Sequence, residues 1–220
     1  KALSVALETH LNSNDSFKDL AEDYKTLFLY KSKLKVEKYH DVKWLPEFKE
    51  NLEFVKEYIN KAFTYIPNRQ TFENKIIFFE ESHVQDGGTS NDVQFVKHLV
   101  EKYGKERVLV KRHPRTRGDR FSNLGVEQIE EYFLPWELFV LNNDCRNCIL
   151  CAASSLSLIN MLFWDLDTGN NIFIMLYNII VNEGGFSKTR EGPVYYKYLY
   201  ELLEKTKVNI PVNINEFDDI

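Results

Sequence analysis

A short basic segment carries the residue types with the most specific chemistry in this chain. Residues 111–117 read KRHPRTR and place four positive charges around His113, although the whole chain has a formal net charge of −5. Pro114 restricts the backbone directly after His113. Such a loop fits a phosphate-bearing ligand, because guanidinium, ammonium and imidazole groups donate hydrogen bonds to phosphate oxygens. A solvated basic loop with a surface histidine is the alternative interpretation.

Two serines and one glutamate are the further candidates for ligand binding. Ser154 and Ser155 follow the apolar residues 148–153, where a helix is expected to begin. Free N–H groups and the helix dipole attract anions at such a point, although the serines also suit simple capping of a core helix. Glu137, within PWEL at residues 135–138, can accept hydrogen bonds from a ribose beside a phosphate site, or begin an ordinary helix.

These candidates form one site only if a sheet brings them to the same edge. Four short apolar runs predict buried strands, at residues 76–79, 108–110, 148–151 and 172–176. Helices are expected between or after them, at residues 91–100, 126–132, from 154 onward, and 194–203. Alternating strands and helices indicate a parallel sheet covered by helices. Residues 71–220 are therefore predicted to form an α/β, Rossmann-like unit whose ligands bind beyond the carboxyl ends of its strands.

The first seventy residues are more polar and less regular. Residues 1–70 are predicted to form a mostly helical, partly extended connecting region, with segments at residues 17–24, 27–30, 34–37 and 52–59. The chain has 44% hydrophobic residues but no apolar run near the ~20 residues that span a bilayer. Its negative charge gives no overall attraction for nucleic acid, so nucleic acid is not expected as a partner.

Three motifs that resemble metal or phosphate sites are interpreted as structural. The cysteines at 145, 148 and 151 have the spacing of part of an iron–sulfur ligand run, but the sequence has no fourth cysteine, so core or loop thiols are expected. An odd cysteine count also favours a reducing cytoplasm over a secreted disulfide scaffold. Residues 165–167 (DLD) precede a turn, and residues 184–189 (GGFSKT) lack the glycine that a phosphate loop needs before its lysine. No metal and no cofactor are predicted.

The order of the remaining motifs resembles a known enzyme family. A strand, KxHPR, PxEL and a strand ending in two serines are similar to the bacterial sialyltransferases of GT-B fold. The closest resemblance is to glycosyltransferase family 52, the lipooligosaccharide sialyltransferases, which build surface glycans as capsule-synthesis transferases do. Glu137 follows His113 by 24 residues (137 − 113), and Ser154 follows Glu137 by 17 (154 − 137). The resemblance covers residues 75–165 well and the remainder weakly.

The resemblance implies a donor site and a reaction. His113 and Pro114 would contact the phosphate of CMP-sialic acid, and Glu137 would bind the cytidine ribose. Ser154 and Ser155 would hold the phosphate at the start of a helix. The expected reaction is inverting, metal-independent transfer of sialic acid to a terminal sugar of a bacterial glycan acceptor, in lipooligosaccharide or capsule. His113 is expected to stabilise the departing CMP by donating a proton or a hydrogen bond.

A carboxylate must deprotonate the acceptor hydroxyl in this reaction. Asp86, in the glycine-rich loop after the first strand of the sheet, is the predicted base, although a turn-forming aspartate is the alternative. Asp92 is the second candidate. Glu80 and Glu81, at the end of that strand, are further candidates.

The resemblance also bears on domain organisation. A GT-B enzyme has two Rossmann-like domains, and the sequence indicates one. The chain is therefore expected to be the C-terminal, donor-binding part of a transferase, with residues 1–70 a connecting region and remnant of the acceptor side. A cytoplasmic location is expected, with membrane contact at the inner face, a homodimer and activity of this part alone left open. A transferase for another sugar nucleotide and a non-catalytic nucleotide-binding domain are the alternative functions.

Overall fold

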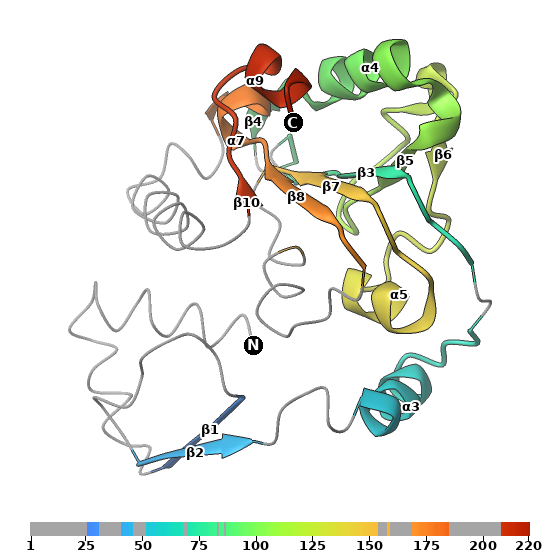
Figure 1. Ribbon diagram of the computed structural model, residues 1–220, viewed down its shortest axis with the longest axis vertical. Helices are drawn as coiled ribbons and strands as arrows, with labels where there is room; N and C mark the ends of the chain where they lie inside the picture. The colour runs from blue at the N-terminus through green and yellow to red at the C-terminus, as the bar shows by residue number, and fades with distance from the viewer. Residues whose placement is uncertain are drawn as a thin grey trace. The chain divides into compact units, whose positions relative to one another are not determined.

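The computed structural model describes most of the C-terminal two thirds of the chain and shorter segments before it (Figure 1). The described residues are 26–30, 41–45, 52–67, 70–82, 84–85, 87–153, 158, 169–184 and 208–220. The chain divides into two compact units, one of residues 1–66 with 160–166 and the other of residues 67–159 with 167–220. All the candidate site residues belong to the second unit.

The first unit contains two strands and one described helix. β1 (Thr26–Tyr30) and β2 (Asp41–Leu45) pair in parallel, and α3 (Leu52–Ala62) follows. β1 coincides with the apolar run at residues 27–30, and α3 with the helical spacing at residues 52–59. The segments expected at residues 17–24 and 34–37 lie outside the described residues.

A six-stranded, fully parallel sheet is the centre of the second unit. Its strands are β3 (Ile76–Phe79), β5 (Val108–Lys111), β6 (Glu127–Gln128), β7 (Ile149–Ala152), β8 (Ile172–Met175) and β10 (Val208–Asn209). Their spatial order is β10-β8-β7-β3-β5-β6, and every neighbouring pair is parallel. Numbered along the chain, this order is 3-2-1-4-5-6, the order of the Rossmann fold. The prediction of an α/β unit with a Rossmann-like parallel sheet is confirmed.

The central strands are continuous apolar runs because both faces of the sheet are covered. All four residues of β3 are buried, and Ile76 pairs with Val108 of β5 and with Ile149 of β7. Side chains alternate between the faces along a strand, so a run without polar residues requires an apolar layer on each side.

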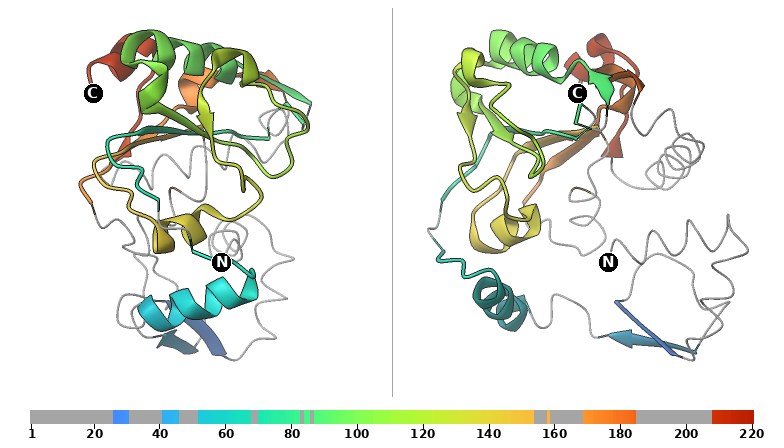
Figure 2. Two further views of the ribbon diagram at one scale, coloured as in Figure 1. Left: turned by 90° about the vertical axis from the view of Figure 1, so that its right-hand side faces the viewer. Right: turned by 180° about the vertical axis from the view of Figure 1, so that it is seen from behind.

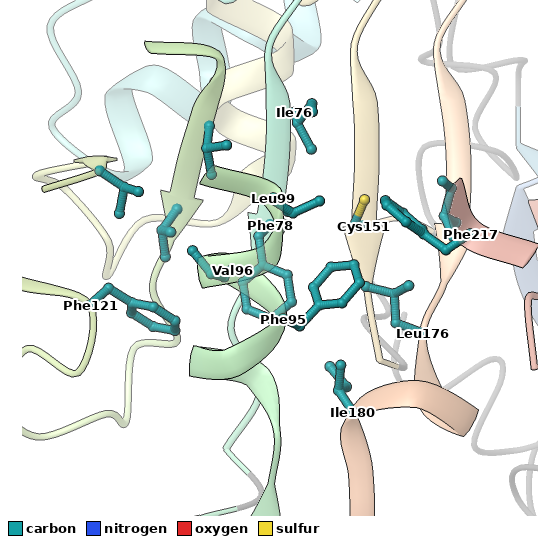
Figure 3. Packing of buried hydrophobic residues seen from close by; sticks show 14 of the residues in the cluster. Ile76, Phe78, Phe95, Val96, Leu99, Phe121, Cys151, Leu176, Ile180 and Phe217 are labelled. Carbon is teal, nitrogen blue, oxygen red and sulfur yellow. The ribbon is translucent and has the colours of Figure 1, made fainter. Parts of the chain in front are cut away.

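One face of the sheet packs against α4 (Asp92–Tyr103), α7 (Tyr177–Ile180) and α9 (Ile214–Asp218). Figure 3 shows Phe78 of β3 among Phe95 and Val96 of α4, and the ring centroids of Phe78 and Phe95 are 6.0 Å apart. Phe217 of α9 adds an edge-to-face contact with Phe95 at 5.0 Å. α4 ends at Gly104, whose φ of 83° suits glycine and stops the helix before β5.

The opposite face is covered by α5 (Trp136–Asn142), and Figures 1 and 2 show α4 and α5 on opposite sides of the sheet. Trp136 is fully buried and meets Phe79 of β3 edge to face, with ring centroids 5.0 Å apart. Two short 3₁₀ helices, Lys105–Arg107 and Ser122–Leu124, lie in the connections on either side of β5. The unit thus has three layers, with the apolar core on both sides of β3 and β7.

Residues 126–132, predicted as a helix, form β6 and the turns that follow it. Val126 and Ile129 are both buried, and this spacing of three suggested a helix. Pairing with β5 decides otherwise, since Glu127 lies opposite Leu109 and the Ile129 N–H donates to the Val110 carbonyl at 3.0 Å. The helix predicted at residues 194–203 lies outside the described residues, as does most of the one expected from residue 154.

A short antiparallel ribbon completes the second unit. β4 (Gly88–Ser90) pairs with β9 (Val181–Gly184), and the Asn91 N–H donates to the Ile180 carbonyl at 2.7 Å. β4 follows β3, and β9 follows β8 and α7. The ribbon therefore joins the segments that leave the sheet on either side of β7.

Candidate functional site at the carboxyl edge of the sheet

The carboxyl ends of the parallel strands bring several candidate residues to one edge. β3 connects to β5 on one side, whereas β7 connects to β8 on the other, so the topological switch point lies between β3 and β7. Ligands of open α/β sheets bind outside the carboxyl ends of strands at such a point. Glu80 follows β3, His113 lies just beyond β5, and Ala153 follows β7.

His113 is held by three hydrogen bonds from two neighbouring connections. Its backbone N–H donates to Glu80 Oε2 at 3.1 Å, and its carbonyl accepts from the Thr116 N–H at 3.0 Å. Its ring Nδ1 accepts from the Arg115 backbone N–H, also at 3.1 Å. An accepting Nδ1 places the proton of the neutral ring on Nε2. The loop therefore fixes both the position and the tautomer of His113.

Glu80 anchors this loop from below. Its side chain is fully buried, and burial raises its pKa above the ordinary glutamate value. Hydrogen bonds from the His113 backbone and the Thr116 side chain, together with the charge of Arg120, act in the opposite direction. The Glu80 N–H also donates to the Lys111 carbonyl at 3.0 Å. Glu80 is thus a structural partner of the His113 loop.

Arg120 joins Glu80 to the first residue of α4. Its guanidinium donates two 2.7 Å hydrogen bonds to the two carboxylate oxygens of Asp92, and a third, at 3.4 Å, to Glu80 Oε1. Asp92 is only 3% exposed in its side chain. A carboxylate that is buried and bound on both oxygens is poorly placed to reach an acceptor hydroxyl. The geometry therefore favours a structural role for Asp92, the second candidate base.

This pairing also changes the first turn of the Rossmann unit. In dinucleotide-binding proteins the N-terminus of the first helix receives the pyrophosphate. Here that helix is α4, and the Asp92 carboxylate already accepts from the Val93 N–H at 2.8 Å. An internal anion therefore occupies the position that a pyrophosphate would take, which leaves the ends of β5 and β7 for an external anion.

The four basic residues around His113 have separate roles. Lys111 is buried and donates to the Tyr132 and Arg112 carbonyls. Arg112 donates to the Gly118 carbonyl and lies over the Tyr132 ring, 4.6 Å from its centroid. Both charges therefore support the loop internally.

The other two basic residues of the loop lie closer to solvent. Arg115 is exposed and its guanidinium donates to the buried Ser82 hydroxyl. Arg117 is exposed, and among the described residues it makes no hydrogen bond or ion pair. Arg117 is thus the basic side chain of this loop with the fewest internal commitments.

Glu137 lies in the first turn of α5, on the face opposite α4. Burial lowers the pKa of Lys111 to about 8, and the charge of Glu137 opposes this shift. The carboxylate of Glu137 therefore attracts the ammonium at the end of β5. Pro135 precedes α5 and has φ near −59°, which suits a helix start.

The structure thus joins some predicted residues and does not describe others. His113 contacts Glu80, and Glu137 interacts with Lys111 of the same strand end that carries His113. Pro114 is exposed beside His113. Asp86, Ser154 and Ser155 lie outside the described residues. Arg120 and Lys111 were not singled out by sequence as partners of Asp92 and Glu137, because no short spacing rule links residues 28 and 26 positions apart.

The three cysteines are buried and free of disulfides. Burial raises the thiol pKa of Cys145 to about 12 and of Cys148 to about 11, and it raises that of Cys151 as well. Cys148 Sγ lies 2.8 Å from the Phe72 carbonyl oxygen. Within the described part of the chain, no three His, Cys, Asp or Glu side chains converge as metal ligands would. The thiols are core residues in this structure.

Comparison of the chain with models of protein families, with curated proteins and with solved structures found no match. The class that fold and topology define is an α/β unit of Rossmann type with a histidine loop at its ligand edge. Among the residues that the structure describes, no helix combines the length and apolar character needed to cross a bilayer.

Proposed function

We propose that the second unit binds a nucleotide phosphate at the carboxyl edge of its sheet, as the donor-binding part of a glycosyltransferase. The observation that carries the proposal is the position of His113 and Pro114 directly after β5, beside the switch point of a 3-2-1-4-5-6 sheet. Glu80 holds the backbone of His113 in place there. A fixed imidazole at the ligand edge is suited to phosphate recognition.

A mononucleotide suits the edge better than a dinucleotide. Asp92 and Arg120 fill the helix start that a pyrophosphate would use. His113 and Arg117 remain as phosphate ligands on the β5 side, and Ser154 and Ser155 are proposed on the β7 side. Glu137 is proposed to bind the ribose.

The proposed donor is CMP-sialic acid, on the motif resemblance. The acceptor hydroxyl oxygen attacks the anomeric carbon, and the bond from that carbon to the phosphate oxygen breaks with its electron pair passing to that oxygen. CMP departs as a phosphate dianion, and the acceptor proton passes to a carboxylate, for which Asp86 is proposed. The product is a terminal sialic acid on a bacterial surface glycan, formed with inversion and without a metal. Localised donors at the phosphate oxygens stabilise the charge that develops there.

CMP titration by calorimetry tests the binding site. A hydrogen bond to a charged phosphate contributes about 1.5–3 kcal/mol, so His113→Ala should weaken CMP binding by at least about tenfold. His98→Ala is the matched control, since His98 lies on α4 and pairs with Asp218 of α9 at 2.9 Å; it should change CMP affinity less than twofold. Unchanged CMP affinity in His113→Ala would contradict the proposed phosphate site.

Two further measurements separate the classes of function. Release of CMP from CMP-sialic acid in the presence of a lactose-type acceptor, lost in Asp86→Ala, supports the transferase. CMP binding with no release in any longer form of the protein supports a non-catalytic nucleotide-binding domain. Tighter binding of UMP or GDP than of CMP supports a transferase that uses another sugar nucleotide.

A further inference from the structure

The hydrogen bonds of His113 restrict the form in which it can act. Its Nδ1 accepts from the Arg115 backbone N–H at 3.1 Å, and a backbone N–H can only donate. We propose that His113 binds the nucleotide phosphate as a neutral imidazole, donating Nε2–H and keeping its proton throughout the reaction. This inference rests on the proposed function and specifies the role of one residue in it.

The loop geometry opposes the imidazolium form. A proton on Nδ1 would point at the Arg115 N–H, so that two donors would face each other and the turn would have to open. That turn is closed independently, by the Thr116 N–H on the His113 carbonyl and by the His113 N–H on Glu80. The ring therefore stays neutral while these three bonds persist.

The charged groups around His113 come from three connections. Glu80, after β3, contacts its backbone, and Arg115 lies in its own loop. Arg120 and Asp92 lie behind Glu80 and form a bidentate pair with each other. Glu80 and Asp92 are thus both in contact with Arg120, which leaves no uncompensated carboxylate pair to draw a second proton onto the ring.

A neutral donor changes the expected chemistry of the leaving group. The phosphate oxygen that receives the electron pair of the broken bond gains a hydrogen bond from Nε2–H, and no proton moves. CMP then leaves as a dianion whose charge is stabilised by hydrogen bonds and by nearby cations such as Arg117. An imidazolium would instead transfer its proton and leave CMP as a monoanion.

Two isosteric variants of the full chain distinguish these roles, with CMP as the probe. In His113→Gln the amide nitrogen reaches the place of Nε2 and donates to the phosphate. In His113→Asn the amide oxygen accepts the Arg115 N–H, as Nδ1 does, but no donor stands at the place of Nε2. We expect His113→Gln to bind CMP within about threefold of wild type, and His113→Asn to lose about tenfold or more, as His113→Ala does.

The pH dependence of wild-type CMP affinity is the second readout. A neutral donor predicts affinities at pH 6.5 and 7.5 within twofold of each other. An imidazolium donor with an ordinary histidine pKa of about 6.5 predicts a loss of about fivefold over that range. A fivefold loss, or a His113→Gln variant no better than His113→Asn, overturns the inference. If His113→Ala binds CMP as wild type does, the proposed function fails instead.

Discussion

Replacing Arg120 with alanine removes the guanidinium that binds two buried carboxylates. The side chains of Asp92 and Glu80 are 3% and 0% exposed, and that of Arg120 is 22% exposed. Removing one partner of a buried ion pair destabilises a protein by about 3–5 kcal/mol, because the remaining charge is left uncompensated. Since water reaches part of Arg120, we expect the lower end, about 3 kcal/mol, for Arg120→Ala.

The loss should depend on pH in a defined direction. Without the guanidinium, the pKa values of Asp92 and Glu80 rise, because two like charges are buried near each other. A carboxyl group with a raised pKa in the folded state has its full stability contribution below its unfolded pKa, and that contribution is lost as the pH rises through the folded pKa. Arg120→Ala should therefore be less destabilised at pH 5 than at pH 8.

Urea unfolding followed by circular dichroism at pH 5 and pH 8 measures both effects. Lys97→Ala is the control, since Lys97 pairs with Glu101 on the exposed surface of α4 at 3.6 Å; it should change stability by less than about 0.5 kcal/mol. Adding Asp92→Asn to Arg120→Ala should restore part of the stability at pH 8, because one buried charge is removed. A loss below about 1 kcal/mol, or an equal loss at both pH values, refutes the reasoning.

Three further outcomes are expected. Burial raises the pKa of Glu80 above 4.5, so the charged form is disfavoured in the folded protein, and the stability of Glu80→Gln relative to wild type, measured by urea unfolding, should increase from pH 4.5 to pH 7.5. Because burial lowers the pKa of Lys111 to about 8, wild-type stability gains from deprotonation between pH 8 and 10.5, and Lys111→Met should lack this gain in thermal unfolding; an unchanged pH slope would contradict it. The three buried thiols should resist a thiol reagent at pH 8 in the folded protein and all react in urea, so prompt reaction of the native protein would contradict their burial.

The strands of the sheet were predictable because burial on both faces imposes a simple composition. β3, β5, β7 and β8 are each apolar over nearly their whole length, and each was expected within two residues of its observed bounds. The two edge strands, β6 and β10, have two residues each and are stabilised by pairing with β5 and β8. Two residues carry no periodicity, so local sequence cannot indicate such strands.

The candidate site was predictable in its position and less so in its partners. His113 and Pro114 were expected after a strand because the basic run directly follows an apolar one. That run suggested four charges available to a ligand, whereas Lys111 and Arg112 are engaged within the protein. The Arg120 contact with Asp92 depends on how the connections after β3 and β5 fold against each other, which no local pattern encodes.

The pairing of β3 also constrains how the chain can be made. Ile76 lies opposite Val108, 32 residues later, but also opposite Ile149, 73 residues later. During synthesis from the N-terminus, β3, α4 and β5 can assemble while the other edge of β3 still lacks its partner. Until residues 149–152 emerge, that edge presents unpaired backbone groups of the apolar segment IIFF, the kind of edge that associates with other chains. We expect nascent chains that end before β7 to depend on a chaperone, and chains that include it to be released from that dependence.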